Sequence, residues 1–128
     1  MASNTIKYEE FERYLQQFDW LQATINQFLK DARMAGLDAP NLDPAQGAAL
    51  VIEATTAWVD DLKGDHLGFQ SFNYRVDLPS SVEPMNMATS EVATLYLFRC
   101  FQKVWLRKRF SEGPSKDEEE IRQKHLKP

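Results

Sequence analysis

A short basic block near the end of the sequence is the clearest candidate for binding chemistry. Residues 99–110 contain five Lys and Arg side chains and no acidic one, whereas residues 1–98 contain six basic and fourteen acidic side chains. Arg99, Lys103 and Arg107 follow one another at steps of four, which places them along one face of a helix. Like charges at this spacing repel by roughly 0.2–0.5 kcal/mol per pair, so we expect a nearby group that offsets them.

Three sources of negative charge can offset this basic face. The first is an external polyanion such as a nucleic-acid backbone. The second is the negative C-terminal end of the helix dipole, which favours basic residues in the last turns. The third is a set of acidic side chains from the preceding segments, for which the candidates are Glu9, Glu12, Asp60 and Asp61. Because the rest of the chain is acidic, we favour neutralisation within the molecule and keep polyanion binding as the alternative.

Two large apolar residues fall outside the apolar stripes of their predicted helices. Trp20 shares its helix face with Arg13 and Gln27, and Leu106 lies beside basic residues. Trp is enriched among the residues that dominate binding energy in protein interfaces. Trp20 is therefore either an interface anchor or a rim residue folded over its neighbours. The predicted protein interface consists of Trp20, Leu106, Arg99, Lys103 and Arg107.

Few residues offer catalytic or metal chemistry. The chain has one Cys and two His, and its five Gly do not form a phosphate-binding loop. Cys100 lies among apolar residues in mid-helix, which is typical of an inert buried thiol, although His66 could supply a base. Asp60, Asp61 and Asp65 near His66 lack a known ligand spacing. The sequence thus predicts no catalytic residue, no metal and no cofactor, and it favours a non-enzymatic protein.

Residues 69–78 follow a different pattern from their surroundings. Apolar residues from Phe72 to Leu78 alternate with polar ones, which is the period of a half-buried strand. A lone strand needs a partner for its backbone groups. The alternatives are a strap over the helices, a hairpin with residues 82–85, and pairing with the same segment of a second subunit. A pocket beneath this segment, in a ligand-binding or enzymatic module, would be lined by Phe72, Tyr74, Arg75 and Cys100.

The remaining sequence predicts helices. Apolar residues recur every seven positions between Phe11 and Ala35, and Gly36 follows them as a C-terminal cap. Asp43 and Pro44 form a typical helix start. The expected helices cover residues 5–35, 44–63 and 89–110, and a weakly docked helix or charged tail is expected within residues 111–128.

A chain of 128 residues has the size of one domain. We expect one helical domain over residues 1–110, followed by the charged tail or short helix. We expect a mostly α fold with a three-helix, bundle-like core and one extended segment between the second and third helices.

No apolar run approaches the ~20 residues that cross a membrane. The single Cys is typical of a reducing compartment, which predicts a cytoplasmic protein without a membrane partner. The favoured function is a small adaptor or regulatory protein that binds a protein partner, including a second copy of itself as a homodimer.

Overall fold

The computed structural model of the chain describes residues 7–111. Within this range the fold is mostly helical, as predicted, and no strand is present. Short 3-10 turns, η1 (Pro44–Gln46) and η2 (Pro84–Asn86), precede the third and fifth helices. The helix or tail predicted for the C-terminus lies beyond residue 111, outside the described residues. The α-helices in the described range are α1 (Tyr8–Leu15), α2 (Phe18–Met34), α3 (Ala48–Lys63), α4 (His66–Arg75) and α5 (Thr89–Ser111).

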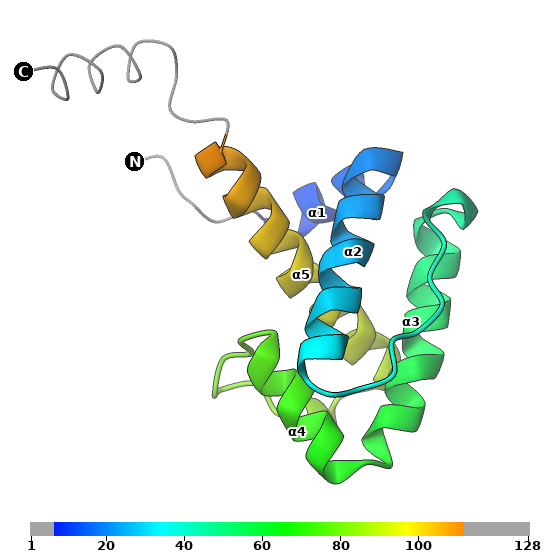
Figure 1. The fold of residues 1–128 in the computed structure, drawn as a ribbon, viewed down its shortest axis with the longest axis vertical. Helices are drawn as coiled ribbons and strands as arrows, with labels where there is room; N and C mark the ends of the chain where they lie inside the picture. The colour runs from blue at the N-terminus through cyan, green and yellow to red at the C-terminus, as the bar shows by residue number, and fades with distance from the viewer. Residues whose placement is uncertain (1–6, 112–128) are drawn as a thin grey trace, which may run out of the picture.

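Helix α5 is the element against which most of the others pack. It lies against both α2 and α3, and α1 covers its side next to α2 (Figure 1). Helix α4 closes the end of the molecule, where it contacts α2 and α3 (Figure 1). All five helices contribute buried apolar side chains to one core. None of these helices is both long enough and apolar enough to cross a lipid bilayer.

The predicted helix over residues 5–35 is divided into α1 and α2. Gln17 has an extended backbone, with φ −93° and ψ 127°, and it precedes the first turn of α2. The break tilts α1 onto α5, where the Phe11 ring lies 5.0 Å from the Phe98 ring and 5.3 Å from the Phe101 ring. Packing of Phe11 onto α5 therefore accounts for a break that the continuous apolar pattern did not predict. Gly36, with φ 78°, follows Ala35, the C-cap residue of α2, which is the usual place of a left-handed glycine at a helix end.

The prediction of an extended segment over residues 69–78 is wrong, because most of it belongs to α4 and the turn that follows. Phe69, Phe72 and Val76 are buried, at the spacing of one helix face. Tyr74 would share a strand face with Phe72, but in the helix it lies on the other side and is 86% exposed. The apolar residues of this segment therefore fit the period of a strand and that of a helix. The burial of Phe69, Phe72 and Val76 in the core favours the helix.

Both ends of α4 are specified by acidic residues. The Asp65 side chain accepts a hydrogen bond of 3.0 Å from the backbone N–H of Gly68, which is a typical N-cap. After the last turn, Asp77 adopts a left-handed conformation with φ 58°. The N–H of Leu78 then donates to the carbonyl of Asn73 at 3.2 Å, which satisfies a carbonyl that the helix leaves unpaired. These two aspartates mark the helix ends in place of Gly or Pro.

An aromatic cluster joins four helices in the core. Phe72 of α4 contacts the rings of Phe28 of α2, Trp58 of α3 and Tyr96 of α5, with centroid distances of 5.1, 5.1 and 4.7 Å. Phe72 is completely buried. The Tyr96 hydroxyl also forms a hydrogen bond with the Asn73 side chain. Phe72 therefore anchors α4 to the rest of the molecule.

Candidate functional site

A completely buried carboxylate, Asp31 of α2, lies at the centre of a polar cluster. Lys103 Nζ lies 3.0 Å from Asp31 Oδ2, and Arg75 Nε lies 3.6 Å from Asp31 Oδ1. The amide of Gln27 donates a hydrogen bond of 3.0 Å to Asp31 Oδ1. Because a buried charge is costly without a partner, these contacts are what allow Asp31 to be buried. The cluster connects α2, α4 and α5.

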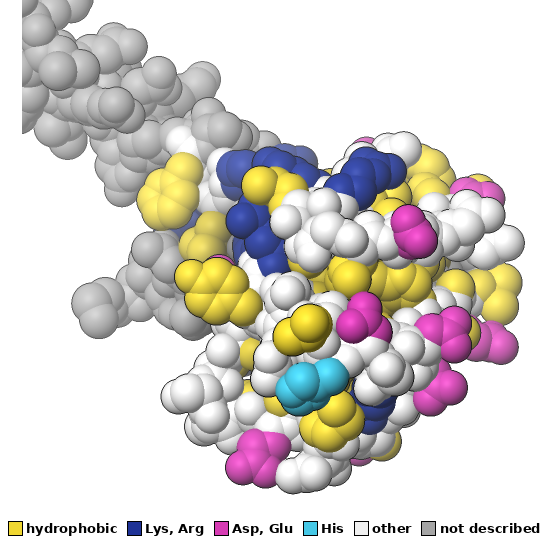
Figure 2. Space-filling model, turned by 60° about the horizontal axis from the view of Figure 1, so that its bottom comes forward, with side chains coloured by type: hydrophobic (Ala, Val, Ile, Leu, Met, Phe, Trp, Pro, Cys, Tyr) yellow, Lys and Arg dark blue, Asp and Glu magenta, His cyan; other side chains and the backbone are white. Residues whose placement is uncertain are grey.

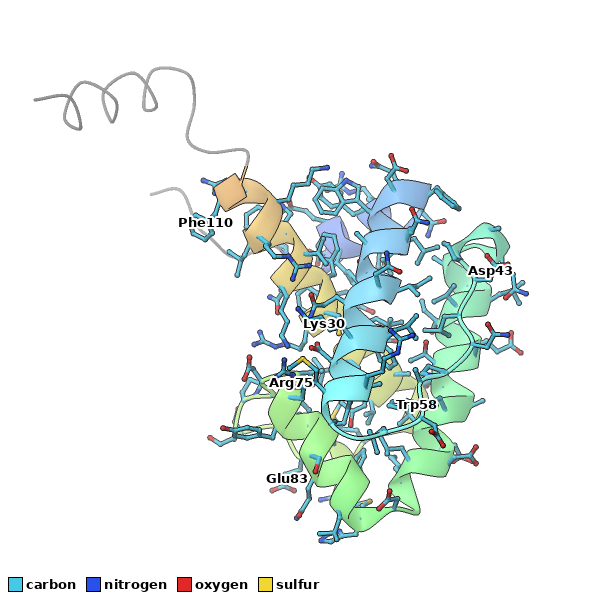
Figure 3. All side chains as sticks on the ribbon, viewed as in Figure 1. Lys30, Asp43, Trp58, Arg75, Glu83 and Phe110 are labelled. Atoms are coloured by element: carbon cyan, nitrogen blue, oxygen red, sulfur yellow. The ribbon has the colours of Figure 1, made fainter. Side chains whose placement is uncertain are left out.

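The predicted basic face of α5 meets the C-terminal end of α4. The last carbonyls of a helix have no partner within it, and the helix dipole makes this end negative. Lys103 Nζ donates to the carbonyl of Arg75 at 2.8 Å, and Arg99 Nε donates to the carbonyl of Val76 at 3.2 Å. Figure 3 shows Arg75 where the end of α4 approaches α2 and α5. Two cations of α5 thus cap α4 from outside.

The third member of the basic face, Arg107, is held by a neutral side chain. Its Nη1 donates to Gln27 Oε1 at 2.7 Å, and Arg99 Nη1 donates to Gln102 Oε1 at the same distance. Both ion pairs that join described residues involve Asp31. The partners of the basic face are therefore Asp31, helix carbonyls and the Gln27 and Gln102 amides, and of these only Asp31 carries a negative charge. They are not the predicted acids Glu9, Glu12, Asp60 and Asp61.

The last turns of α5 carry exposed cations next to aromatic rings. Arg107 and Arg109 are exposed, and Phe110 is 68% exposed. The Arg109 guanidinium lies 5.5 Å from the centre of the Trp105 ring. Figure 1 shows this end of α5 projecting away from α2 and α3, and Figure 2 shows Lys and Arg side chains gathered beside hydrophobic ones. We call the set the α5 terminal surface; it surrounds the end of the helix and consists of Trp105, Leu106, Arg107, Arg109 and Phe110, with Trp20 of α2 at its edge.

No known protein family, curated protein or solved structure that was compared with the chain matches it.

Trp20 lies at the edge of the core, half-buried. Its ring packs edge-on against Tyr14 at 4.9 Å and contacts Phe101 at 5.5 Å. Lys108 Nζ lies 4.9 Å from the centre of the Trp20 ring, in cation–π geometry. Trp20 is thus folded over its neighbours, which is one of the two alternatives given by its sequence position. The structure leaves part of the ring in solvent at the α5 terminal surface.

Sequence reasoning missed Asp31 and placed Gln27 outside the apolar stripe of its helix. Both are buried. A signal was present, because Thr24, Gln27 and Asp31 follow at the spacing of one helix face and adjoin the core residue Phe28. Polar residues at the edge of an apolar stripe can face a neighbouring helix. Here the neighbour is α5, whose Lys103 pairs with Asp31.

The four residues predicted to line a pocket are not gathered around one cavity. Phe72 is in the core, and Tyr74 is exposed on the other side of α4. Arg75 and Cys100 both contact Asp31, from α4 and α5. A separate open hollow of about 330 Å³ is lined by Glu10, Arg13, Tyr14 and Gln17.

The surroundings of Cys100 favour an unreactive thiol. It is completely buried, and its Sγ lies 3.6 Å from Asp31 Oδ2. Burial, followed by the negative charge of Asp31, raises the thiol pKa well above its usual value, although Lys103 and Arg99 act in the opposite direction. In residues 7–111, no group of three or more His, Cys, Asp or Glu is arranged to hold a metal ion.

We expect the Cys100 thiol of the folded protein to react with a disulfide reagent at least about 100-fold more slowly than in the unfolded chain, because the thiolate forms only when α5 becomes accessible. The measurement is the rate of thionitrobenzoate release at pH 8, with and without denaturant. The chain unfolded in urea provides the control, since it carries the same single thiol. Similar rates in both conditions would contradict the burial of Cys100.

Proposed function

We propose that the protein is a binding module of the adaptor or regulatory type that recruits an acidic partner protein through the α5 terminal surface. The observation that carries the proposal is the exposure of Arg107, Arg109 and Phe110 in the last turns of α5, where Arg109 also lies over the half-buried Trp105 ring. Arg and aromatic residues are enriched in protein interfaces, and Trp, Tyr and Arg dominate their energetics. The surface therefore has the composition of a contact site.

The charge of this surface indicates the charge of its partner. Arg107 is bonded to the neutral Gln27 side chain, and Arg109 lies over the neutral Trp105 ring. Neither contact cancels a positive charge. A partner that supplies Asp or Glu opposite these guanidiniums, together with an apolar side chain against Phe110, would complement the surface in both respects.

Nucleic acid is the alternative ligand of the same surface, and it has less support. Polyanion binding favours a continuous cationic track, but Arg99 and Lys103 already donate to the end of α4, and Lys103 also pairs with Asp31. The exposed cations that remain, Arg107 and Arg109, lie among the apolar residues Leu106 and Phe110, so they do not form a continuous track. The third hypothesis, an enzymatic or small-ligand module, has less support still, since its predicted lining residues lie apart.

The test begins with a photo-crosslinking residue at Phe110 of the full-length chain, and the same residue at the exposed Leu50 of α3 as a control. We expect an acidic protein to be captured from host extract at Phe110 but not at Leu50. That protein is then purified and titrated. We expect the double variant Arg107→Glu, Arg109→Glu to bind this protein at least about tenfold more weakly. Both substituted side chains would then repel the acidic residues of the partner.

A matched control separates a specific contact from a general effect of charge. Lys30 and Arg33 are exposed on α2, and their reversal to Glu removes the same total charge. We expect this variant to bind the partner within about twofold of the wild type, as is usual for charges outside a contact. Equal losses in both variants would contradict the proposed surface. Capture of nucleic acid at Phe110 would replace the proposal with the alternative.

A further inference from the structure

The ends of α2 and α4 meet at a contact between a thioether and a guanidinium. Met34 is the last residue of α2, and Arg75 is the last residue of α4. Arg75 Nη2 donates a hydrogen bond of 2.8 Å to Met34 Sδ. Met34 is 57% exposed, so a small oxidant dissolved in water can reach its side chain.

The Arg75 guanidinium has weak contacts with its neighbours. Its Nε is buried and lies 3.6 Å from Asp31 Oδ1, but this nitrogen makes no hydrogen bond to a described residue. A guanidinium carries five N–H donors, whereas the thioether sulfur that it contacts is a weak acceptor. A stronger acceptor at the position of Met34 Sδ would therefore hold Arg75 more firmly.

We propose that Met34 is a site of reversible oxidation by peroxides, and that its sulfoxide binds Arg75 more firmly than the thioether does. A lone pair of the sulfur attacks one oxygen of hydrogen peroxide. The O–O bond breaks as the S–O bond forms, and the second oxygen leaves as water with the proton of the first. The sulfur loses two electrons, which the peroxide gains. A methionine sulfoxide reductase, with a dithiol as the reductant, restores the thioether.

The new oxygen changes the contact with Arg75. A sulfoxide oxygen carries a partial negative charge, and hydrogen bonds from a charged donor are roughly twice as strong as neutral ones. The Met side chain has three rotatable bonds, and the Arg75 side chain is 38% exposed, so both can move to admit the oxygen. Oxidation of a Met in a core is disruptive. At Met34 we expect it to tie the end of α4 to the end of α2, whatever partner the α5 terminal surface binds.

Met85 provides the matched control. It lies in η2 and is 49% exposed, which is close to the exposure of Met34. Its sulfur makes no hydrogen bond to any residue in the described part of the chain. Met85→Leu therefore isolates oxidation beside a guanidinium, and Met34→Leu isolates the same chemistry without one.

Hydrogen–deuterium exchange of the two full-length variants, before and after treatment with hydrogen peroxide, tests the proposal. Peptide mass spectrometry identifies the oxidised residues. In Met85→Leu, we expect oxidation of Met34 to slow exchange of the amides of residues 76–78 at least about threefold, and reductase treatment to restore the first rate. In Met34→Leu, we expect oxidation of Met85 to leave these rates within about 1.5-fold. Both variants keep Met1 and Met87, so oxidation there affects them alike.

A third variant tests the donor. Combining Met85→Leu with Arg75→Ala removes the guanidinium, and we expect oxidation of Met34 to change the exchange by less than about 1.5-fold. Slowing that persists in this variant would overturn the contact with Arg75. Circular dichroism checks that the variant folds, and the comparison of Met34 with Met85 decides by itself if it does not.

Three outcomes of that comparison would overturn the proposal. The first is exchange that is unchanged or faster after oxidation of Met34. The second is equal slowing in Met85→Leu and Met34→Leu, which would show an effect of oxidation in general. The third is a peroxide treatment that oxidises Met85 and leaves Met34 intact.

Discussion

The substitution Phe72→Ala will lower the free energy of unfolding by about 3–5 kcal/mol, the range for buried Phe residues. Phe72 is completely buried and contacts the rings of Phe28, Trp58 and Tyr96. Its removal leaves a cavity between four helices that these rings cannot fill without moving. Urea unfolding followed by far-ultraviolet circular dichroism measures the change.

The matched control is Tyr74→Ala, two residues further along the same helix. Tyr74 is 86% exposed, so we expect the free energy of unfolding to change by less than about 0.5 kcal/mol at low protein concentration. The pair also discriminates between the two local structures. On a strand the two side chains would share one face and both substitutions would be costly. Comparable losses in both variants would contradict the helical assignment of residues 66–75.

The second large effect is expected at Asp31. The substitution Asp31→Ala leaves Lys103 and Arg75 without their carboxylate, and breaking a buried ion pair costs about 3–5 kcal/mol. The Lys103 side chain is 26% exposed, so it can recover some contact with water, and we expect a value near the lower end. Urea unfolding again gives the free energy.

Two further variants test this explanation. Asp60→Ala removes an exposed carboxylate, and we expect a change within about 0.5 kcal/mol. Combining Asp31→Leu with Lys103→Met removes the closer ion pair, and we expect it to be less destabilised than Asp31→Ala, because only Arg75, whose side chain is 38% exposed, then lacks its carboxylate. A double variant less stable than Asp31→Ala would show that the uncompensated charge is not the main cost.

The sequence could predict the helices whose signals are local. The apolar stripe over residues 89–110 corresponds to α5, and Gly36 correctly marks the end of α2. Asp43 does accept a hydrogen bond from the N–H of Ala45, at 2.9 Å, but it caps η1 and not α3. Periodicity and capping are properties of neighbouring residues, and for this reason they could be read without the fold.

The errors arose where a distant contact decides the local structure. The chain from Phe72 to Leu78 fits both a strand and a helix, and the surrounding rings of Phe28, Trp58 and Tyr96 favour the helix. The break at Gln17 likewise depends on the contact of α1 with α5. The local signals at α4 conflict, because Asp65 is a typical helix N-cap whereas the alternation after Phe72 is typical of a strand.

The candidate site was predictable in part for the same reason. The four-residue steps of Arg99, Lys103 and Arg107 identified a cationic face and required a negative group nearby. The group could not be identified, because the capped carbonyls belong to a helix that the sequence pattern did not predict. Asp31 is more than 60 positions from Lys103 in the sequence, and only the packing of α2 on α5 brings the two together.

Arg99 and Lys103 belong to α5, but their side chains donate to the last carbonyls of α4. The same two cations therefore serve both helices. Any anion that competed for them would withdraw donors from the carbonyls of Arg75 and Val76, and would so loosen the end of α4. Thermodynamic reciprocity requires the converse, since anything that holds α4 in place weakens the binding of that anion by the same factor. These two hydrogen bonds therefore couple the order of the last turn of α4 to the availability of two cations on α5.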